Sequence, residues 1–214
     1  MRKQILPYLA AAAIAIVTCS TALAAPETFK FDKNHTLIGF RIRHFVSKVE
    51  GRFKDFEGSI TLDRQNPAGS KVDLTIQATS IDTSNENRDK HLRSADFFDV
   101  EKFPTITFKS TKVTPKGTDA FDVTGDFTMR GVTKSLTVPV KLGGFVKAGK
   151  VEKVGFELGG FILNRKDFGI VWNSPVEAGG LMLGDDVEIN CQVEANRPLE
   201  APAPAAAPPA KSGS

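Results

Sequence analysis

The sequence is poor in the residues that cross-link small secreted domains or form polar binding surfaces. Its 214 residues include only two cysteines, one tryptophan and one tyrosine, against 16 phenylalanines. Two cysteines exclude a disulfide-rich scaffold, and no uninterrupted apolar run reaches the roughly 18 residues that a membrane-spanning helix needs. A hydrophobic fraction of 41% with 25% charged residues instead indicates one globular domain with its own core.

The first residues follow the layout of a secretory signal peptide. Two basic residues precede an apolar stretch over 9–17, and residues 22–24 read Ala-Leu-Ala, which is a small-x-small cleavage site. We predict that residues 1–24 form a cleaved signal peptide, with cleavage after Ala25 as the near alternative. The mature protein is then expected in the periplasm.

Removal of this segment changes both the charge and the cysteine count. Loss of Arg2 and Lys3 lowers the basic residues from 28 to 26 against 25 acidic ones. The resulting charge of +1 is too balanced to favour nucleic acid or an anionic membrane surface as a partner, and we expect no stable membrane insertion. Cys191 becomes the only cysteine, and we expect it to be buried, because an exposed thiol is a liability in an oxidising compartment. A lipoprotein beginning at Cys19 is the less favoured alternative, because the residues just before it are not small.

The other end of the chain is also an extension. Residues 198–214 read PLEAPAPAAAPPAKSGS, a Pro/Ala-rich tail that we predict to be disordered because it cannot bury enough apolar surface. The folded domain is therefore predicted to span 27–197.

Alternation of apolar and polar residues with a period of two dominates this domain and indicates at least eight strands. The apolar sets are Ile38, Phe40 and Ile42; Phe56, Gly58, Ile60 and Leu62; Val72, Leu74, Ile76 and Ala78; Ile106 and Phe108; Phe121, Val123, Gly125, Phe127 and Met129; Leu136, Val138, Val140 and Leu142; Val154, Phe156 and Leu158; Val187, Ile189, Cys191 and Val193. One-sided strands bury their apolar face in a sandwich or a closed barrel. Inward glycines favour strong coiling, so we predict an all-β, eight-stranded antiparallel barrel.

One segment, residues 83–95, departs from this pattern. Thr83 and Glu86 have the spacing of a capping box, and two pairs of opposite charges follow at i,i+4 spacing. We predict one short polar helix across an end of the barrel, with Leu92 facing inward. The doublets at 143–144, 159–160 and 179–180 are Gly-Gly with no helix after them, and are typical of bulges and turns.

Little in the sequence indicates catalysis. The three histidines are His35, His44 and His91; the first two have opposite strand parity, and no pair has the close spacing of zinc ligands. There is no G-x-S-x-G nucleophile motif, and Cys191 has inward parity. We predict a protein without enzyme activity or a metal site. The alternative is a metal-assisted hydrolase that uses these histidines.

Four ordered strings resemble motifs of the YceI-like family. The longest reads NENRDKHLRSADFFDVEKFP over 85–104, and the others are DKNHT at 32–36, GDFTMRGVTK at 125–134 and NRKDFGI at 164–170. Together they extend from about residue 28 to 195, which is essentially the whole predicted domain.

The resemblance implies a secreted, usually periplasmic, lipocalin-like extended barrel with one helix beside it. It also implies binding of an amphiphile, typically a polyisoprenoid such as a polyprenyl quinone, or a fatty-acid derivative. Neither catalytic residues nor a cofactor other than this lipid follow from it. The motif residues Asp89, His91 and Arg93 are expected to fix the helix to the barrel rim. Phe97 and Phe98 are not expected both to point inward.

Strand parity gives the candidate ligand-binding residues. The strands contribute Phe40, Ile42, Phe56, Ile60, Leu74, Ile76, Phe108, Phe127, Leu136, Val138 and Phe156. The helix exit contributes Phe98, and the less regular segment 165–183, expected at the mouth, contributes Phe168, Trp172 and Met182.

The leading hypothesis is a periplasmic protein that holds a long-chain isoprenoid or fatty-acid-like ligand for transport, storage or sequestration. A lining of phenylalanine without phenolic hydroxyls suits a hydrocarbon chain, and each buried methylene contributes about 0.8 kcal/mol. Further expected partners are a second copy of the chain and a membrane redox or envelope protein. A barrel filled by its own side chains, acting as a partner-binding module, is the remaining alternative.

Overall fold

The computed structural model describes residues 25–175 and 181–199. The predicted signal peptide, the Gly-Gly doublet at 179–180 and all but the first two residues of the predicted tail lie outside these residues. The elements are β1 (Glu27–Phe31), β2 (Leu37–His44), β3 (Ser47–Phe53), β4 (Phe56–Leu62), η1 (Pro67–Gly69), β5 (Lys71–Gln77), η2 (Ala78–Ser80), β6 (Ile81–Asp82), α1 (Glu86–Arg93), β7 (Thr105–Pro115), β8 (Ala120–Met129), β9 (Val132–Ala148), β10 (Val151–Asn164), η3 (Arg165–Phe168) and β11 (Leu183–Pro198).

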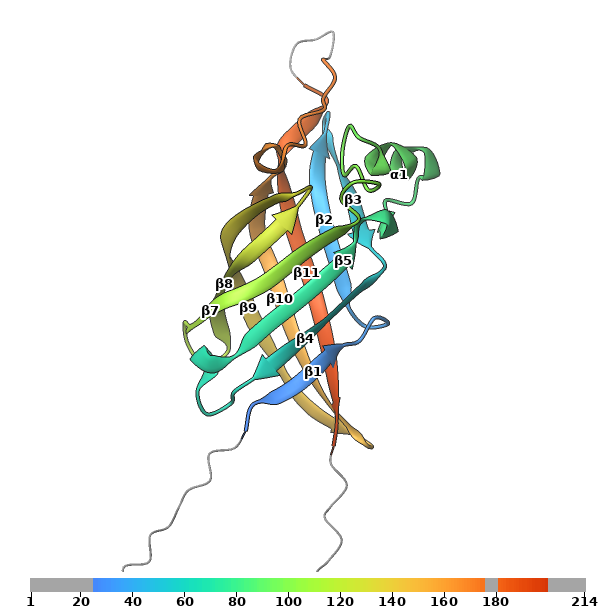
Figure 1. The fold of residues 1–214 in the computed structure, drawn as a ribbon. Coiled ribbons are helices and arrows are strands. Elements are labelled where there is room, and N and C mark those ends of the chain that lie inside the picture. Colours follow the sequence, from blue (N-terminus) through green and yellow to red (C-terminus); the bar gives the residue numbers. More distant parts are fainter. Residues whose placement is uncertain (1–24, 176–180, 200–214) are drawn as a thin grey trace, which may run out of the picture.

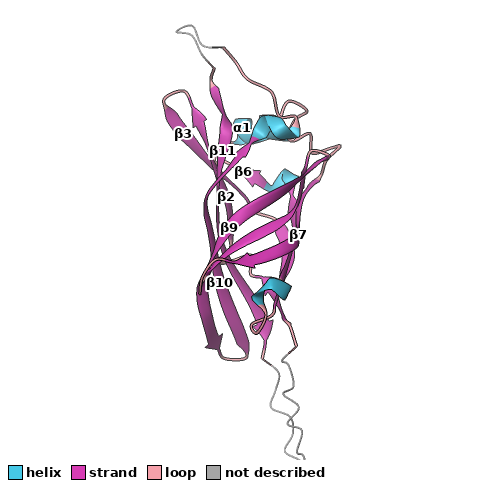
Figure 2. Ribbon diagram, turned by 90° about the vertical axis from the view of Figure 1, so that its left-hand side faces the viewer, coloured by secondary structure: helices cyan, strands magenta, loops and turns pink. Residues whose placement is uncertain are grey.

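Eight antiparallel strands close into the predicted barrel (Figure 1). Their order is β1-β4-β5-β7-β8-β9-β10-β11, and pairing of Phe31 in β1 with Ala195 in β11 completes the ring. The upper part of β11 pairs instead with β2, which continues into β3 and β6. The described chain begins and ends at the lower end of the barrel, and α1 lies at the upper end (Figures 1 and 2).

Three strands that alternation did not indicate, β1, β3 and the two-residue β6, belong to this sheet. β3 escapes detection because one of its inward positions is Gly51, where a Cβ would lie 2.3 Å from the ring of Phe40 on β2. Gly58 in β4 similarly leaves space for the ring of Phe31. Inward glycines therefore accommodate aromatic rings from neighbouring strands.

The helix begins later than the capping-box spacing predicts. Asn85 is the N-cap, and its side chain accepts a hydrogen bond from the Arg88 amide. Thr83 instead donates its amide and its hydroxyl to Asp89, at 2.9 and 2.5 Å. The predicted start at Thr83 is thus wrong, because Thr83 is used to hold the buried Asp89 rather than the first turn.

The same helix is fixed to the barrel at its other end. The Arg93 guanidinium donates to the carbonyls of Thr79 and Ile81, at 2.7 and 2.8 Å. Leu92 contributes to the barrel interior.

In the described residues no helix is long and apolar enough to cross a membrane.

Bulges at the glycine doublets change which residues face inward. In β10, Leu158 pairs with Cys191 but Phe161 pairs with Ile189, so one extra residue is accommodated at 159–160. Inward positions therefore shift from even to odd numbers, and Phe161 points into the barrel while Ile162 is exposed.

The upper halves of β9 and β10 are not joined by a ladder. β10 pairs with β9 only over Val151–Glu157. Above that point, within the described residues, β10 pairs with β11 and β9 pairs with β8. Side chains close this seam, because Leu158 and Phe161 pack against the cluster that contains Val138. Pro139 lies in the same part of β9, where a strand edge tolerates its missing N–H.

Candidate functional site

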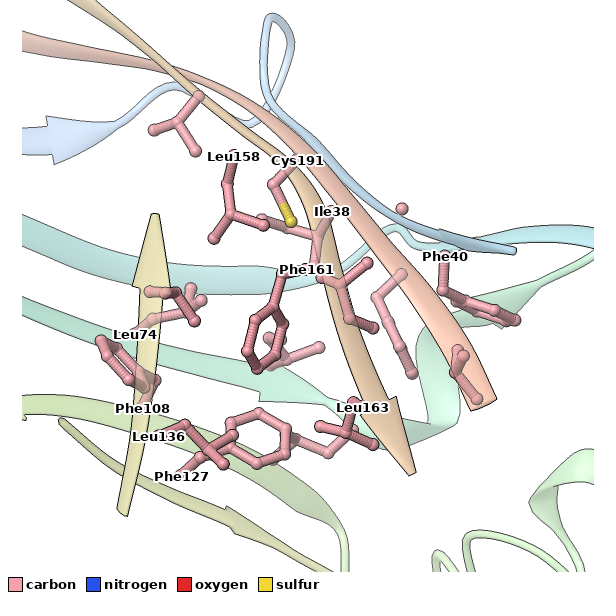
Figure 3. A pocket seen from close by; sticks show the side chains of 18 of the residues that line it. Ile38, Phe40, Leu74, Phe108, Phe127, Leu136, Leu158, Phe161, Leu163 and Cys191 are labelled. Carbon is pink, nitrogen blue, oxygen red and sulfur yellow. The ribbon is translucent and has the colours of Figure 1, made fainter. Parts of the chain in front are cut away.

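A cavity of about 770 Å³ runs through the barrel, within the range of about 300–1,000 Å³ that is usual for small-molecule sites. Its walls are overwhelmingly apolar, and Figure 3 shows side chains from several strands pointing toward a common space. Phe161 and Leu158 from β10 lie across from Leu74 and Phe108 (Figure 3). The interior is therefore hollow rather than filled by its own side chains.

Thirteen of the fifteen candidate residues line this cavity. They are Phe40, Ile42, Ile60, Leu74, Ile76, Phe98, Phe108, Phe127, Leu136, Val138, Phe156, Trp172 and Met182.

The other two candidates, Phe56 and Phe168, are buried but do not line the cavity. Phe56 meets the ring of Phe31 edge-on at 6.5 Å, and Phe168 meets the ring of Phe127 edge-on at 5.4 Å. Each therefore packs behind an aromatic ring that does line the cavity. Strand parity predicts the face of the sheet on which a side chain lies. It does not predict whether that side chain reaches the cavity or packs behind another residue.

The sequence analysis missed several residues that line the cavity. Eleven of the sixteen phenylalanines line it: Phe31, Phe40, Phe53, Phe97, Phe98, Phe108, Phe121, Phe127, Phe145, Phe156 and Phe161. Six of these were not among the candidates: Phe31, Phe53, Phe97, Phe121, Phe145 and Phe161. The expectation that Phe97 and Phe98 cannot both face inward is wrong, because they lie in a turn where strand alternation does not apply. Phe161 was missed because the bulge at 159–160 reverses the inward parity. Ile189 could have been assigned to the cavity from its strand parity alone.

The polar lining at the upper end of the cavity comes mainly from α1 and β2. Arg88, His91 and His44 all contribute there. The His91 ring stacks edge-on against Phe97 and Trp172, with centroids 5.0 and 4.9 Å away. This end combines aromatic surface with hydrogen-bonding groups, whereas the middle of the cavity is apolar.

Arg165 fixes the loop that bears Trp172. Its side chain is 3% exposed and donates to the carbonyls of Gly184, Ile170 and Trp172, and to the carboxylate of Asp185. Burial lowers the pKa of this guanidinium and outweighs the opposing effect of Asp185. An arginine nevertheless stays charged at physiological pH, so this end contains a buried cation.

A cluster of four charged side chains lies at the lower end. Arg64 and Arg197 each contact both Glu27 and Glu152 at 2.5–2.9 Å. Burial alone would raise the pKa of Glu152, but hydrogen bonds from the two arginines outweigh it and lower that pKa. Arg64 also lies 4.0 Å over the ring of Phe145. Paired charges therefore lie together at the lower end, where Arg64 lines the cavity.

Cys191 lies in the cavity wall, as its inward parity predicts (Figure 3). Burial raises the pKa of its thiol to about 11. The thiolate is the reactive form of cysteine, so this residue acts in the wall as a small apolar side chain.

Among the described residues, one group of side chains could hold a metal ion. Asp32, His35 and Glu194 have ligand atoms within 4.8 Å of one another. However, the ammonium of Lys153 is 2.5 Å from Glu194 and 3.8 Å from Asp32, so a cation already balances the two carboxylates. His44 and His91 line the cavity, whereas His35 does not. The three histidines therefore do not form one site.

This cluster gives a pH-dependent contribution to stability. The hydrogen bond from His35 lowers the pKa of Asp32 from 3.8 to about 2. Ionised Asp32 therefore stabilises the fold above pH 4, and this contribution is lost as the pH falls toward 2. Because His35 is largely exposed, we expect solvent screening to limit it to about 1 kcal/mol.

Urea unfolding of the wild type and of Asp32→Asn, compared from pH 7 to pH 2, measures this contribution. The difference should shrink progressively as the pH falls from 4 toward 2. A difference that stays the same between pH 4 and pH 2 would contradict the assignment.

The geometry defines a lipocalin-like class of protein, a closed antiparallel barrel that encloses an apolar cavity. The YceI-like domain profile matches residues 29–195. The chain is 46% identical over 157 residues to Protein YceI of Escherichia coli O157:H7, covering 71% of this chain and 80% of that protein. It is 45% identical over 179 residues to a UPF0312 protein of Pseudomonas aeruginosa, covering 79% and 88%. The chain therefore belongs to the YceI-like family.

Solved structures agree with this assignment. The Campylobacter jejuni YceI protein is 37% identical, with a TM-score of 0.62 over 78% of this chain and 95% of that one. A domain from Saccharophagus degradans, described as polyisoprenoid binding, matches with a TM-score of 0.60 over 79% and 98%, at 14% identity. This second likeness is one of fold alone.

Proposed function

We propose that this protein is a periplasmic carrier that holds one long-chain isoprenoid lipid, such as a polyprenyl quinone, inside its barrel. The observation that supports this most is the hollow, phenylalanine-rich cavity of about 770 Å³. The polyisoprenoid binding described for the Saccharophagus degradans domain of the same fold is consistent with it. The signal-peptide layout of residues 1–24 supports the periplasmic location.

The distribution of polar groups suggests how the ligand lies. The apolar middle of the cavity suits the hydrocarbon chain, for which burial alone supplies the affinity. The head group would lie at the upper end, where Arg88 and His91 offer polar atoms beside Trp172. The ion cluster around Glu152 would stop the chain at the lower end. Binding of this kind is passive, and we propose no catalytic step.

Organic extraction of the purified protein followed by mass spectrometry tests the proposal. We expect an isoprenoid lipid in a near-equimolar amount, and quenching of Trp172 fluorescence when a quinone is added to delipidated protein. Trp172 is a suitable reporter because it is the only tryptophan and lines the cavity. A protein that contains no lipid and shows no quenching would contradict the proposal.

A further inference from the structure

The tip of the β2–β3 hairpin has an unfavourable sequence for its position. His44 pairs with Ser47, so Phe45 and Val46 form a two-residue turn. A two-residue turn with positive φ at its first residue favours glycine at that position. Phe45 nevertheless has φ of 51°, which is strained for a bulky residue. Its side chain is 42% exposed and Val46 is 104% exposed. Turn geometry therefore disfavours Phe45, and exposure to water favours neither residue.

Two further exposed apolar residues lie on the segments beside this tip. The Phe45 amide donates to the Met182 carbonyl at 2.8 Å, which places Leu181 next to the turn. The Asn173 side chain accepts from the Leu183 amide at 3.0 Å, so the segment that contains Val171 runs alongside. Val171 and Leu181 are both exposed. We call Phe45, Val46, Val171 and Leu181 the apolar rim.

The apolar rim is continuous with the upper end of the cavity. His44, Trp172 and Met182, each adjacent in sequence to a rim residue, line the cavity itself. A ligand leaving at this end would therefore pass directly from the cavity to the rim.

A basic side chain accompanies the rim. Arg43 donates to the Phe45 carbonyl, and after Lys166 and Arg165 it is one of the cations that lower the pKa of Asp185. Apolar tips beside basic side chains are typical of segments that bind the interface of a lipid bilayer.

We propose that the apolar rim docks on a phospholipid bilayer, with the Phe45 and Val46 side chains at the boundary between headgroups and acyl chains. In this orientation the upper end of the cavity faces the membrane, and the described chain ends, Ala25 and Leu199, lie at the far end (Figure 1). The ligand exchanges between bilayer and cavity across the rim. This exchange rests on the proposed lipid-binding function, whereas docking itself does not require a ligand.

The test is a tip variant that combines Phe45→Gly with Val46→Asn. It places glycine at the position with positive φ, as such a turn favours, so the fold should be retained or stabilised. Flotation with ligand-free vesicles of phosphatidylethanolamine and phosphatidylglycerol measures docking. We expect the variant to bind about tenfold more weakly than the wild type. The matched control is Val146→Asn, because Val146 is 57% exposed in the β9–β10 hairpin at the opposite end, and it should bind normally.

Equal vesicle binding by the wild type and the tip variant would overturn the proposal, as would a loss confined to Val146→Asn. Light scattering provides a further check. A wild type that dimerises through the tip, with vesicle binding unchanged in the monomeric variant, would also overturn it.

A second measurement separates docking from the proposed function. Decylubiquinone added in solution should quench Trp172 with equal affinity in the wild type and the tip variant. Uptake of the same quinone from vesicles should be about tenfold slower in the variant. No quenching in either protein, with vesicle binding intact in the wild type, would contradict the lipid-carrier function but support docking. Equal uptake rates would contradict docking as the route of exchange.

Discussion

Substituting Leu136 with tryptophan should lower the affinity for a polyprenyl quinone about a thousandfold without lowering the stability of the protein. Leu136 points into the middle of the cavity (Figure 3) and pairs across the sheet with Gly125. An indole there would block the path of the chain. Exclusion of one five-carbon isoprene unit removes about 4 kcal/mol of burial free energy, which is about a thousandfold in Kd.

Stability should not fall, because the added atoms occupy empty space and bury apolar surface. The measurement is the lipid content of the purified variant by mass spectrometry, together with its Tm. Thr137→Trp is the matched control, since Thr137 is the adjacent, exposed residue on the outer face of β9. It adds the same side chain outside the barrel and should leave the lipid content unchanged. Normal lipid content in Leu136→Trp would show that the ligand does not occupy this part of the interior.

The second large effect is expected at Arg165. Its replacement by methionine keeps much of the side-chain length but leaves the carbonyls of Gly184, Ile170 and Trp172 without their donor. Removing one partner of a buried charged network costs about 3–5 kcal/mol, and the full stability of a domain is only about 5–15 kcal/mol. We therefore expect a large fall in the urea midpoint, and a red-shifted Trp172 emission in the native state.

The adjacent Lys166 is a matched control, because it also pairs with Asp185, at 2.8 Å, but from an exposed position. Lys166→Met should cost less than about 1 kcal/mol. Arg165→Lys should remain close to Arg165→Met, because an ammonium cannot reproduce the planar arrangement of guanidinium donors. Equal losses in Arg165→Met and Lys166→Met would mean that the Asp185 ion pair, rather than the buried carbonyls, determines the effect.

Most of the barrel could be predicted from the sequence because its inner and outer faces differ in polarity. The alternation of Leu136, Val138 and Val140 gives both the strand and the side of it that faces the cavity. The Gly-Gly doublets at 143–144 and 159–160 were expected to be irregular, and bulges occur there. Yet a bulge reverses parity downstream, and its exact pairing depends on the neighbouring strand. Phe161 was therefore not assigned to the cavity.

The charged cluster at the lower end could not be predicted for a different reason. Glu152 has the same inward parity as Val154, but a carboxylate at an inward position is interpreted from sequence as the end of a strand. Its partners come from the loop after β4 and from the far end of β11, and no local pattern links residues 64, 152 and 197. Long-range charge pairing of this kind becomes visible only when the barrel closes.

The seam between upper β9 and upper β10 gives the interior a particular mechanical property. Spreading these two strand segments breaks no ladder between them within the described residues; it only loosens contacts among side chains such as Val138 and Phe161. Dispersion contacts weaken gradually with distance, whereas a ladder hydrogen bond is lost abruptly once its geometry fails. The barrel wall is therefore more compliant along this seam than between strands that share a long ladder. For the proposed lipid ligands, we expect a cost of accommodation that rises smoothly with the width of the ligand.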